Sequence, residues 1–227
     1  MSVCLAHARF RDFCLAEWIE TGRARAPART LAARRPFVLG TSSQGRAAQG
    51  IKPYAPLPSR SEFVKVLMSG KINSDLYATY LWNQHKKYDL LEALAGANGL
   101  LHDLPGISRK HRIEKDYLEL WKEVNPPVLT QITIDYIMHM KYIMHDTNAL
   151  MAHVYVLHMG DLSGGQMIAK KVPGSGTMYK FDTDKKKLKD AIRERTNDDM
   201  AEEAKYVFTS ATNLFKELME LEIELYS

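Results

Sequence analysis

From residue 61 onward, apolar residues recur at intervals of three and four positions, the spacing of one face of an α-helix. The pattern is clearest near the C-terminal end, where Val207, Ala211, Leu214, Leu218, Leu221 and Leu225 follow one another. Capping residues, glycines and prolines separate the periodic segments. These patterns predict eight helices, over residues 61–68, 74–95, 110–123, 133–146, 149–159, 162–171 and 185–195, and from about 197 to the C-terminal end.

No stretch alternates between apolar and polar residues over any length, and no longer segment repeats. We therefore expect an all-α fold, with a single multi-helix domain over residues 59–227 and an atypical leader over residues 1–58. Residues 3–19 could form a short helix. Prolines and glycines interrupt residues 21–60 and predict an unfolded segment there.

The 227-residue chain has a net charge of +4, but its positive charge is concentrated before the helical domain. Between Thr21 and Ser61 there are eight Lys and Arg residues and no Asp or Glu, which leaves 4 − 8 = −4 for the rest. Residues 1–61 contain nine Arg and one Lys, whereas residues 62–227 contain four Arg and 17 Lys. This change indicates a fused segment, an organelle transit peptide or a stretch read from an incorrect start.

Composition also indicates which binding partners and which cellular compartment to expect. Phe37 is the one aromatic residue between Thr21 and Gly50, so a nucleic-acid-binding arm is not favoured. Two cysteines, Cys4 and Cys14, exclude a disulfide scaffold and a cysteine-based zinc site and favour a reducing compartment. We expect a monomer without a membrane span, located in the cytoplasm, or in a plastid if the leader is a transit peptide.

Three glycines interrupt the helical pattern in the middle of the domain, namely Gly160, Gly164 and Gly165. Each costs a helix about 1 kcal/mol relative to alanine, so packing or function must offset that cost. Glycine permits a kink and lets a flat partner approach the backbone closely. A close crossing of two helices is the alternative explanation.

Asp161 lies inside this glycine-rich break, beside Ser163 and Gln166. A carboxylate is costly to bury without donors or water, and a polar cluster of this kind suits a site that handles protons. The alternative is that Asp161 caps the helix that begins at Leu162.

The seven residues Gly-Asp-Leu-Ser-Gly-Gly-Gln at 160–166 resemble the signature of the biliverdin-producing heme oxygenase family. Other segments resemble the family in order and spacing, over residues 60–226 in all. They are Glu62-Phe63, Leu76-Tyr77-x-x-Tyr80, Tyr155 five residues before Gly160, Gly174-x-Gly176-x-x-Tyr179-x-Phe181, Lys189 with Arg193, and Glu202 to Phe208 followed by Leu214-Phe215.

The resemblance implies a heme oxygenase-like fold in which heme b lies between a proximal helix near the N-terminus and a kinked distal helix. Heme would be both cofactor and substrate, and O2 and reductant electrons would convert it to biliverdin, Fe2+ and CO. Gly160 and Gly164 would lie against the heme, and Asp161 would pass a proton through waters to the reacting oxygen. Ferredoxin or a flavoprotein reductase would supply electrons, with basic residues 185–187 as a docking surface.

The same resemblance implies which side chains bind the heme. Lys189 and Arg193, four residues apart on one helix face, would bind propionates. Tyr155 and Tyr80 would hydrogen-bond the heme or its waters, and Phe208 would pack against its edge. The ordinary alternatives are a solvated basic face for the two cations and core positions for the three aromatic residues.

Four histidines lie in or near the motif. His158 is expected to point away from the face that Gly160 presents, so we do not expect it to bind iron. Surface or satisfied core positions are expected for His139, His145 and His153.

The sequence departs from the family at the iron ligand. The proximal histidine should precede the phenylalanine matched by Phe63 by eight residues, a position that Ala55 occupies here. Pro56 and Pro58 also disfavour the expected helix. Either residues 1–58 are not native, or Tyr54, His85 or His7 substitutes, or the chain binds heme weakly or without turnover. The metal ligand therefore stays unknown.

Overall fold

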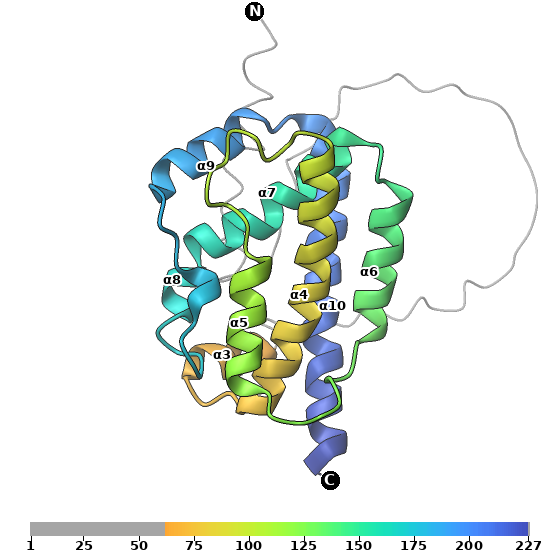
Figure 1. Cartoon of the computed structure of the whole chain (residues 1–227). Coiled ribbons are helices and arrows are strands. Elements are labelled where there is room, and N and C mark those ends of the chain that lie inside the picture. The colour runs from red at the N-terminus through yellow and green to blue at the C-terminus, as the bar shows by residue number, and fades with distance from the viewer. Residues whose placement is uncertain (1–61, 227) are drawn as a thin grey trace, which may run out of the picture.

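The computed structural model describes residues 62–226, and every regular element within that range is helical (Figure 1). The helices are α3 (Glu62–Ser69), α4 (Ser74–Ala97), α5 (Lys110–Leu120), α6 (Gln131–Tyr142), α7 (Thr147–Ser163), α8 (Gly165–Ile168), α9 (Lys185–Glu194) and α10 (Ala201–Tyr226), with short 3-10 turns at Thr177–Tyr179 and Asp198–Met200. The all-α prediction is confirmed for this part of the chain. The predicted leader, including Ala55, and the predicted helix over residues 3–19 lie outside it.

Side-chain caps explain where several helices begin. The Asn73 side chain accepts hydrogen bonds from two backbone N–H groups of α4, and Asp146 and Asp184 do the same for α7 and α9. Thr130 caps α6 through the N–H of Thr133. These caps satisfy N–H groups that have no partner within the helix, so each fixes the first turn.

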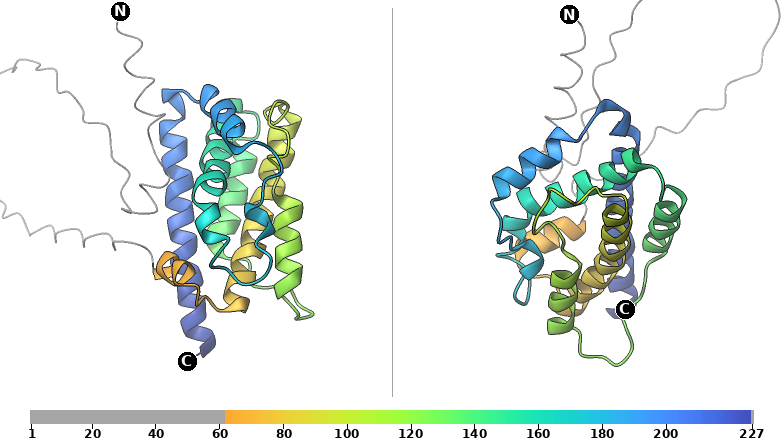
Figure 2. Two further views of the ribbon diagram at one scale, coloured as in Figure 1. Left: turned by 90° about the vertical axis from the view of Figure 1, so that its left-hand side faces the viewer. Right: turned by 45° about the horizontal axis from the view of Figure 1, so that its top comes forward.

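Helix α7 lies at the centre of the bundle, between α10 on one side and α4 with α5 on the other (Figure 2, left). Residues 149–156 of α7 are all buried, whichever face they occupy. A helix that is apolar all round belongs in a core. On α10, the predicted apolar stripe is confirmed at Val207, Leu214 and Leu218, which are fully buried.

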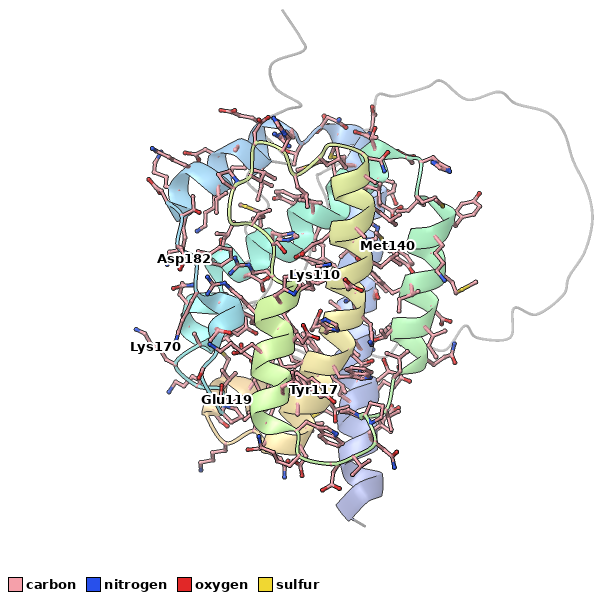
Figure 3. All side chains as sticks on the ribbon, viewed as in Figure 1. Lys110, Tyr117, Glu119, Met140, Lys170 and Asp182 are labelled. Carbon is pink, nitrogen blue, oxygen red and sulfur yellow. The ribbon has the colours of Figure 1, made fainter. Side chains whose placement is uncertain are left out.

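Two buried ionic side chains fasten the loops that flank α5. The Asp116 carboxylate accepts hydrogen bonds from Thr177 N at 2.8 Å, Thr177 Oγ1 at 2.6 Å and Met178 N at 2.8 Å. Arg109 is 2% exposed and donates to four backbone carbonyls, those of Gly106, Ile107, Met178 and Lys180. Its guanidinium also lies 4.0 Å from the centre of the Phe181 ring. The segment after α8 is therefore held against α5 (Figure 3, around Lys110, Tyr117 and Asp182).

The structure corrects the predicted boundaries around the glycine motif. We expected one helix to end at Met159 and another to begin at Leu162, but α7 runs through Gly160 to Ser163. The Gly164 N–H donates to the Gly160 carbonyl at 2.9 Å, which keeps the helix intact across that glycine. The break lies between Ser163 and Gly165, and α8 is shorter than predicted.

Elsewhere the boundaries differ by up to four residues, as at the end of α6, which is Tyr142 and not residue 146. Helix α5 ends three residues before the predicted end, and α6 begins two residues earlier because Thr130 caps it. The last helix starts at Ala201, after a 3-10 turn capped by Asn197.

Within residues 62–226, no helix combines the length and apolar character needed to cross a lipid bilayer. The expected absence of a membrane-spanning helix therefore holds for this part of the chain.

The glycine at position 165 is explained by packing. A Cβ atom there would overlap the ring of Tyr179, which is buried, whereas a Cβ at Gly96 would meet no atom within 4 Å. We expect Gly165→Ala to lower the free energy of unfolding by about 1–3 kcal/mol through overpacking. The matched control Gly96→Ala should raise it by up to about 1 kcal/mol because alanine favours the helix. Urea unfolding of both variants measures this, and equal effects would contradict the packing argument.

Candidate functional site

Asp161 lies in the last turn of α7, and its side chain is buried toward α4. It is 7% exposed, and its Oδ2 accepts a hydrogen bond from the hydroxyl of Tyr88 at 2.6 Å. Because α7 continues past it to Ser163, Asp161 is not the N-cap of a following helix. The alternative that Asp161 caps a helix is therefore wrong, and its carboxylate is available for other interactions.

Burial sets the protonation of this carboxyl. It raises the pKa of Asp161 from 3.8 to about 6, although the Tyr88 hydrogen bond and the nearby charges of His158 and Arg109 oppose the rise. Burial, followed by the charge of Asp161, also raises the pKa of Tyr88, so the phenol keeps its proton. An acid with a pKa near neutral can both give and take a proton at physiological pH.

A second buried carboxylate, that of Glu92, lies near Asp161. Glu92 of α4 is 6% exposed and accepts hydrogen bonds from the backbone N–H groups of Arg109 at 2.5 Å and Lys110 at 3.3 Å, and from the Ser108 hydroxyl. It therefore caps the start of α5 from the neighbouring helix. Its Oε1 also lies 3.8 Å from His158 Nε2.

His158 occupies a core position. It is fully buried, its Nδ1 lies 3.1 Å from the Val154 carbonyl, and its ring meets the Tyr88 ring edge to face at 5.3 Å. The expectation that His158 is no iron ligand stays untested.

Tyrosines gather beside Asp161. Tyr80 is 8% exposed and stacks on Tyr77 with ring centres 5.8 Å apart. Burial, and next the charge of Asp161, raise the pKa of Tyr80. Tyr179 is buried and packs on Gly165. Asp161 therefore faces several phenols that can take part in a proton-carrying network.

Several buried polar atoms around these residues make no hydrogen bond of ordinary geometry within residues 62–226, although Tyr77, Tyr80 and Tyr179 lie close enough to shift one another's pKa. They are the hydroxyls of Tyr77 and Tyr179, Oε1 of Gln84 and Nε2 of His158. Buried polar groups are nearly always satisfied, and water or a ligand takes over where protein does not. The region beside Asp161 is therefore polar enough to hold ordered water or ligand atoms.

Gln166 belongs to the same sequence motif as Asp161, but its side chain bonds to other parts of the chain. Its amide Nε2 donates to the Tyr179 carbonyl at 2.6 Å, and its Oε1 accepts from Lys185 Nζ at 2.8 Å. Gln166 therefore links α8 to the segment at Tyr179 and to the start of α9.

The remaining predicted binding residues lie on three helices, α7, α9 and α10. Tyr155, on α7, and Phe208, on α10, are buried at 3% and 7% exposure. Lys189 and Arg193 are half-buried on α9, and Arg193 pairs with Asp190 at 3.3 Å. A partly exposed pair of this kind is weak, so Arg193 can exchange Asp190 for another anion.

Sequence reasoning missed Tyr88, Glu92 and Arg109. Tyr88 falls at helical spacing among the apolar residues of α4, and this spacing does not reveal that its hydroxyl reaches Asp161. Glu92 and Arg109 resemble surface residues by type, since charged residues are seldom fully buried. No local signal in the sequence points to Glu92, because it caps the start of α5 from another helix.

The comparisons with known proteins agree with one another. The family model described as heme oxygenase matches residues 58–221. A protein named heme oxygenase 2 from Synechocystis is 26% identical over 197 residues, covering 73% of this chain and 78% of its own length. A protein of the same name from Macaca fascicularis is 28% identical, covering 75% of this chain and 63% of its own length.

Solved structures share the fold. Heme oxygenase-1 from Synechocystis, crystallised in complex with heme, matches with a TM-score of 0.64 and 24% identity, covering 73% of this chain and 87% of that one. The heme oxygenase from Leptospira interrogans matches with a TM-score of 0.58 and 26% identity, covering 69% and 90%. Since the family model covers most of the polypeptide and the helices superpose on those of its members, the chain belongs to the heme oxygenase family.

Proposed function

We propose that this protein binds heme and cleaves it to biliverdin, Fe2+ and CO, using O2 and electrons from a reductant. One observation carries the proposal: the carboxyl of Asp161 is buried in the family motif, holds Tyr88 at 2.6 Å and has a pKa of about 6. A group placed in this way can supply protons near neutral pH inside the protein.

The residues beside Asp161 fit heme together with ordered water. The hydroxyls of Tyr77 and Tyr179 and the Gln84 oxygen, which make no hydrogen bond of ordinary geometry within residues 62–226, could bond ordered water or heme atoms. Tyr155, Tyr80 and Phe208 would contact the porphyrin, and Lys189 and Arg193 would pair with its propionates. Heme, when bound, supplies the iron that activates O2 and the porphyrin that is oxidised.

The chain's own residues would then do three things. Gly160 and Gly164 carry no side chain, so they leave room against the porphyrin. Asp161 accepts the Tyr88 hydrogen bond at Oδ2, so it would hold its own proton at Oδ1 and release it from there toward bound water. Glu92 and Arg109 keep α4 and the neighbouring loops in place, so the distance between Tyr88 and Asp161 stays fixed.

Electrons would come from ferredoxin or a flavoprotein reductase. The basic start of α9 supports a docking surface for an acidic donor: Lys187 is exposed, and Lys186 is 87% exposed although it pairs with Asp190 at 2.8 Å. Lys185 contributes less because Gln166 holds its ammonium group.

A second candidate function, heme or tetrapyrrole binding without turnover, is favoured by one observation. Ala55 stands where the family pattern places the proximal histidine, and an alanine side chain cannot bind iron. The two functions separate in one assay: added hemin gives a Soret band in both cases, but only the enzyme converts it to biliverdin under a reductant.

The raised pKa of Asp161 predicts how stability depends on pH. Ionising the buried carboxyl costs the folded state free energy above about pH 6, and this cost vanishes below about pH 4, where the unfolded chain is also protonated. A gap of about two pKa units corresponds to about 3 kcal/mol. Asp161→Asn, which keeps an acceptor for Tyr88, should therefore be more stable than the wild type at about pH 8 and equal to it at about pH 4. Urea unfolding of the heme-free protein measures this, and a difference independent of pH would contradict it.

Loss of the proton donor predicts loss of turnover. We expect Asp161→Asn to bind hemin with nearly unchanged affinity but to form biliverdin about 100-fold more slowly or worse, because general acid catalysis contributes about that much. The matched control is Asp199→Asn, since Asp199 is exposed at the turn before α10. Single-turnover spectra under a reductant measure both. If Asp161→Asn forms biliverdin as fast as the control, Asp161 is not the proton donor.

The alanine at position 55 predicts a response to imidazole. If no side chain occupies the proximal coordination position, imidazole should shift the Soret band of the hemin complex and raise turnover. Ala55→His should abolish this response by supplying the ligand within the chain. Titration of imidazole into both hemin complexes measures the shift. A wild-type spectrum that stays unchanged while hemin is bound means that another residue binds the iron.

A further inference from the structure

A second cluster of ligand-type side chains lies along α7, away from the glycine motif. His139 of α6, His153 of α7 and Glu203 of α10 bring three potential ligand atoms within 4.8 Å of one another. Nε2 of His139 and Nε2 of His153 each lie 2.6 Å from the same oxygen, Oε1 of Glu203. Three helices thus direct two imidazoles and one carboxylate at a single point.

Neighbouring aromatic residues orient the two imidazoles. The Tyr136 hydroxyl lies 2.5 Å from His153 Nδ1, and the Tyr206 ring lies 4.0 Å from the centre of the His139 ring. A carboxylate only accepts hydrogen bonds, so without an ion both Nε2 atoms carry the proton and Tyr136 donates to His153 Nδ1. A hydrogen-bonded partner on the second ring nitrogen is the usual support of a metal-binding histidine.

We propose that His139, His153 and Glu203 form a binding site for one divalent transition-metal ion, Zn2+ in the first instance. Two imidazoles and one carboxylate are a donor set that zinc takes in proteins, with a fourth position left for water. On metal binding, the Nε2 proton of each histidine would move to its own Nδ1, which frees both Nε2 lone pairs for the ion. In His153, Nδ1–H would then donate to the Tyr136 oxygen.

Metal binding requires all three ligand side chains to adjust, because both nitrogens now lie 2.6 Å from one oxygen while the three ligand atoms span up to 4.8 Å. Zinc bonds of about 2.0–2.2 Å place ligand atoms about 3.3 Å apart in a tetrahedral site. The Glu203 oxygen must therefore recede from the two nitrogens by several tenths of an ångström. The side chains of Glu203 and His139 are 20% and 25% exposed, whereas His153 is fully buried. The ion thus has access from solvent on one side, where water can complete its coordination.

A metal here would join three helices at one point. Its binding would favour the folded state, because the unfolded chain does not hold the three ligands together. It would also fix α7 eight residues before Asp161. The site uses no residue that we assign to heme, so it can be tested in the heme-free protein and independently of the proposed function.

Zinc titration tests the site directly. The full-length heme-free protein, freed of metal with a chelator, is titrated with ZnCl2 and followed by calorimetry. We expect one ion per chain for the wild type, and affinity at least 10-fold lower for His139→Ala and for Glu203→Gln. The matched control is His145→Ala, which removes an exposed histidine of the α6–α7 connection and should leave the affinity unchanged.

Two further measurements keep the test decisive. Co2+ should give intense visible absorption bands typical of a tetrahedral site in the wild type but not in Glu203→Gln, and circular dichroism shows whether each variant keeps its helices. Zn2+ should raise the melting temperature of the wild type and of His145→Ala, but raise that of His139→Ala and of Glu203→Gln much less. The proposal is overturned if the wild type binds no stoichiometric ion, or if folded Glu203→Gln binds Zn2+ as tightly as the wild type.

Discussion

A carboxylate inside a protein is stable only where donors, charges or water surround it, and α4 supplies the nearest donor to Asp161. The Tyr88 hydroxyl reaches that carboxylate over 2.6 Å, and this contact depends on how α4 and α7 cross. Glu92, one turn further along α4, caps the start of α5, and Arg109 then holds two loops by four backbone carbonyls. The position of the acid thus depends on a chain of polar contacts across the bundle.

Asp116 shows what a purely structural buried aspartate looks like in the same protein. It is 2% exposed and accepts three protein hydrogen bonds, from Thr177 and Met178. Asp161 is nearly as deeply buried, but among the described residues Tyr88 is the one side chain that donates a hydrogen bond to it, and it lies beside phenols that make no hydrogen bond of ordinary geometry. Asp116, whose acceptor positions are used by protein donors, fixes a loop. Asp161 keeps lone pairs available, and exchange of protons with water requires such lone pairs.

The sequence predicted the helical class and most helix positions because periodicity and capping are local properties. Its errors at Gly160 and Gly164 have a tertiary cause: a glycine was interpreted as a helix end, but buried neighbours keep α7 helical through Gly160. Asp161 could be identified from its motif. Tyr88 and Glu92 could not, because their partners lie 73 and 17 residues away in the chain. Gly165 likewise depends on Tyr179, which only the fold brings against it.

Helix α7 is buried on nearly every side, so each of its polar side chains needs a partner on another helix. His153 finds Tyr136 on α6 and Glu203 on α10, while Asp161 finds Tyr88 on α4. Apolar packing alone tolerates small rotations and shifts of a helix, but these polar pairs do not, because a shift would leave buried groups unsatisfied. The polar residues of α7 therefore fix its rotation and its position along its own axis. That constraint lets a helix near the centre of an apolar core hold an acid at a defined place.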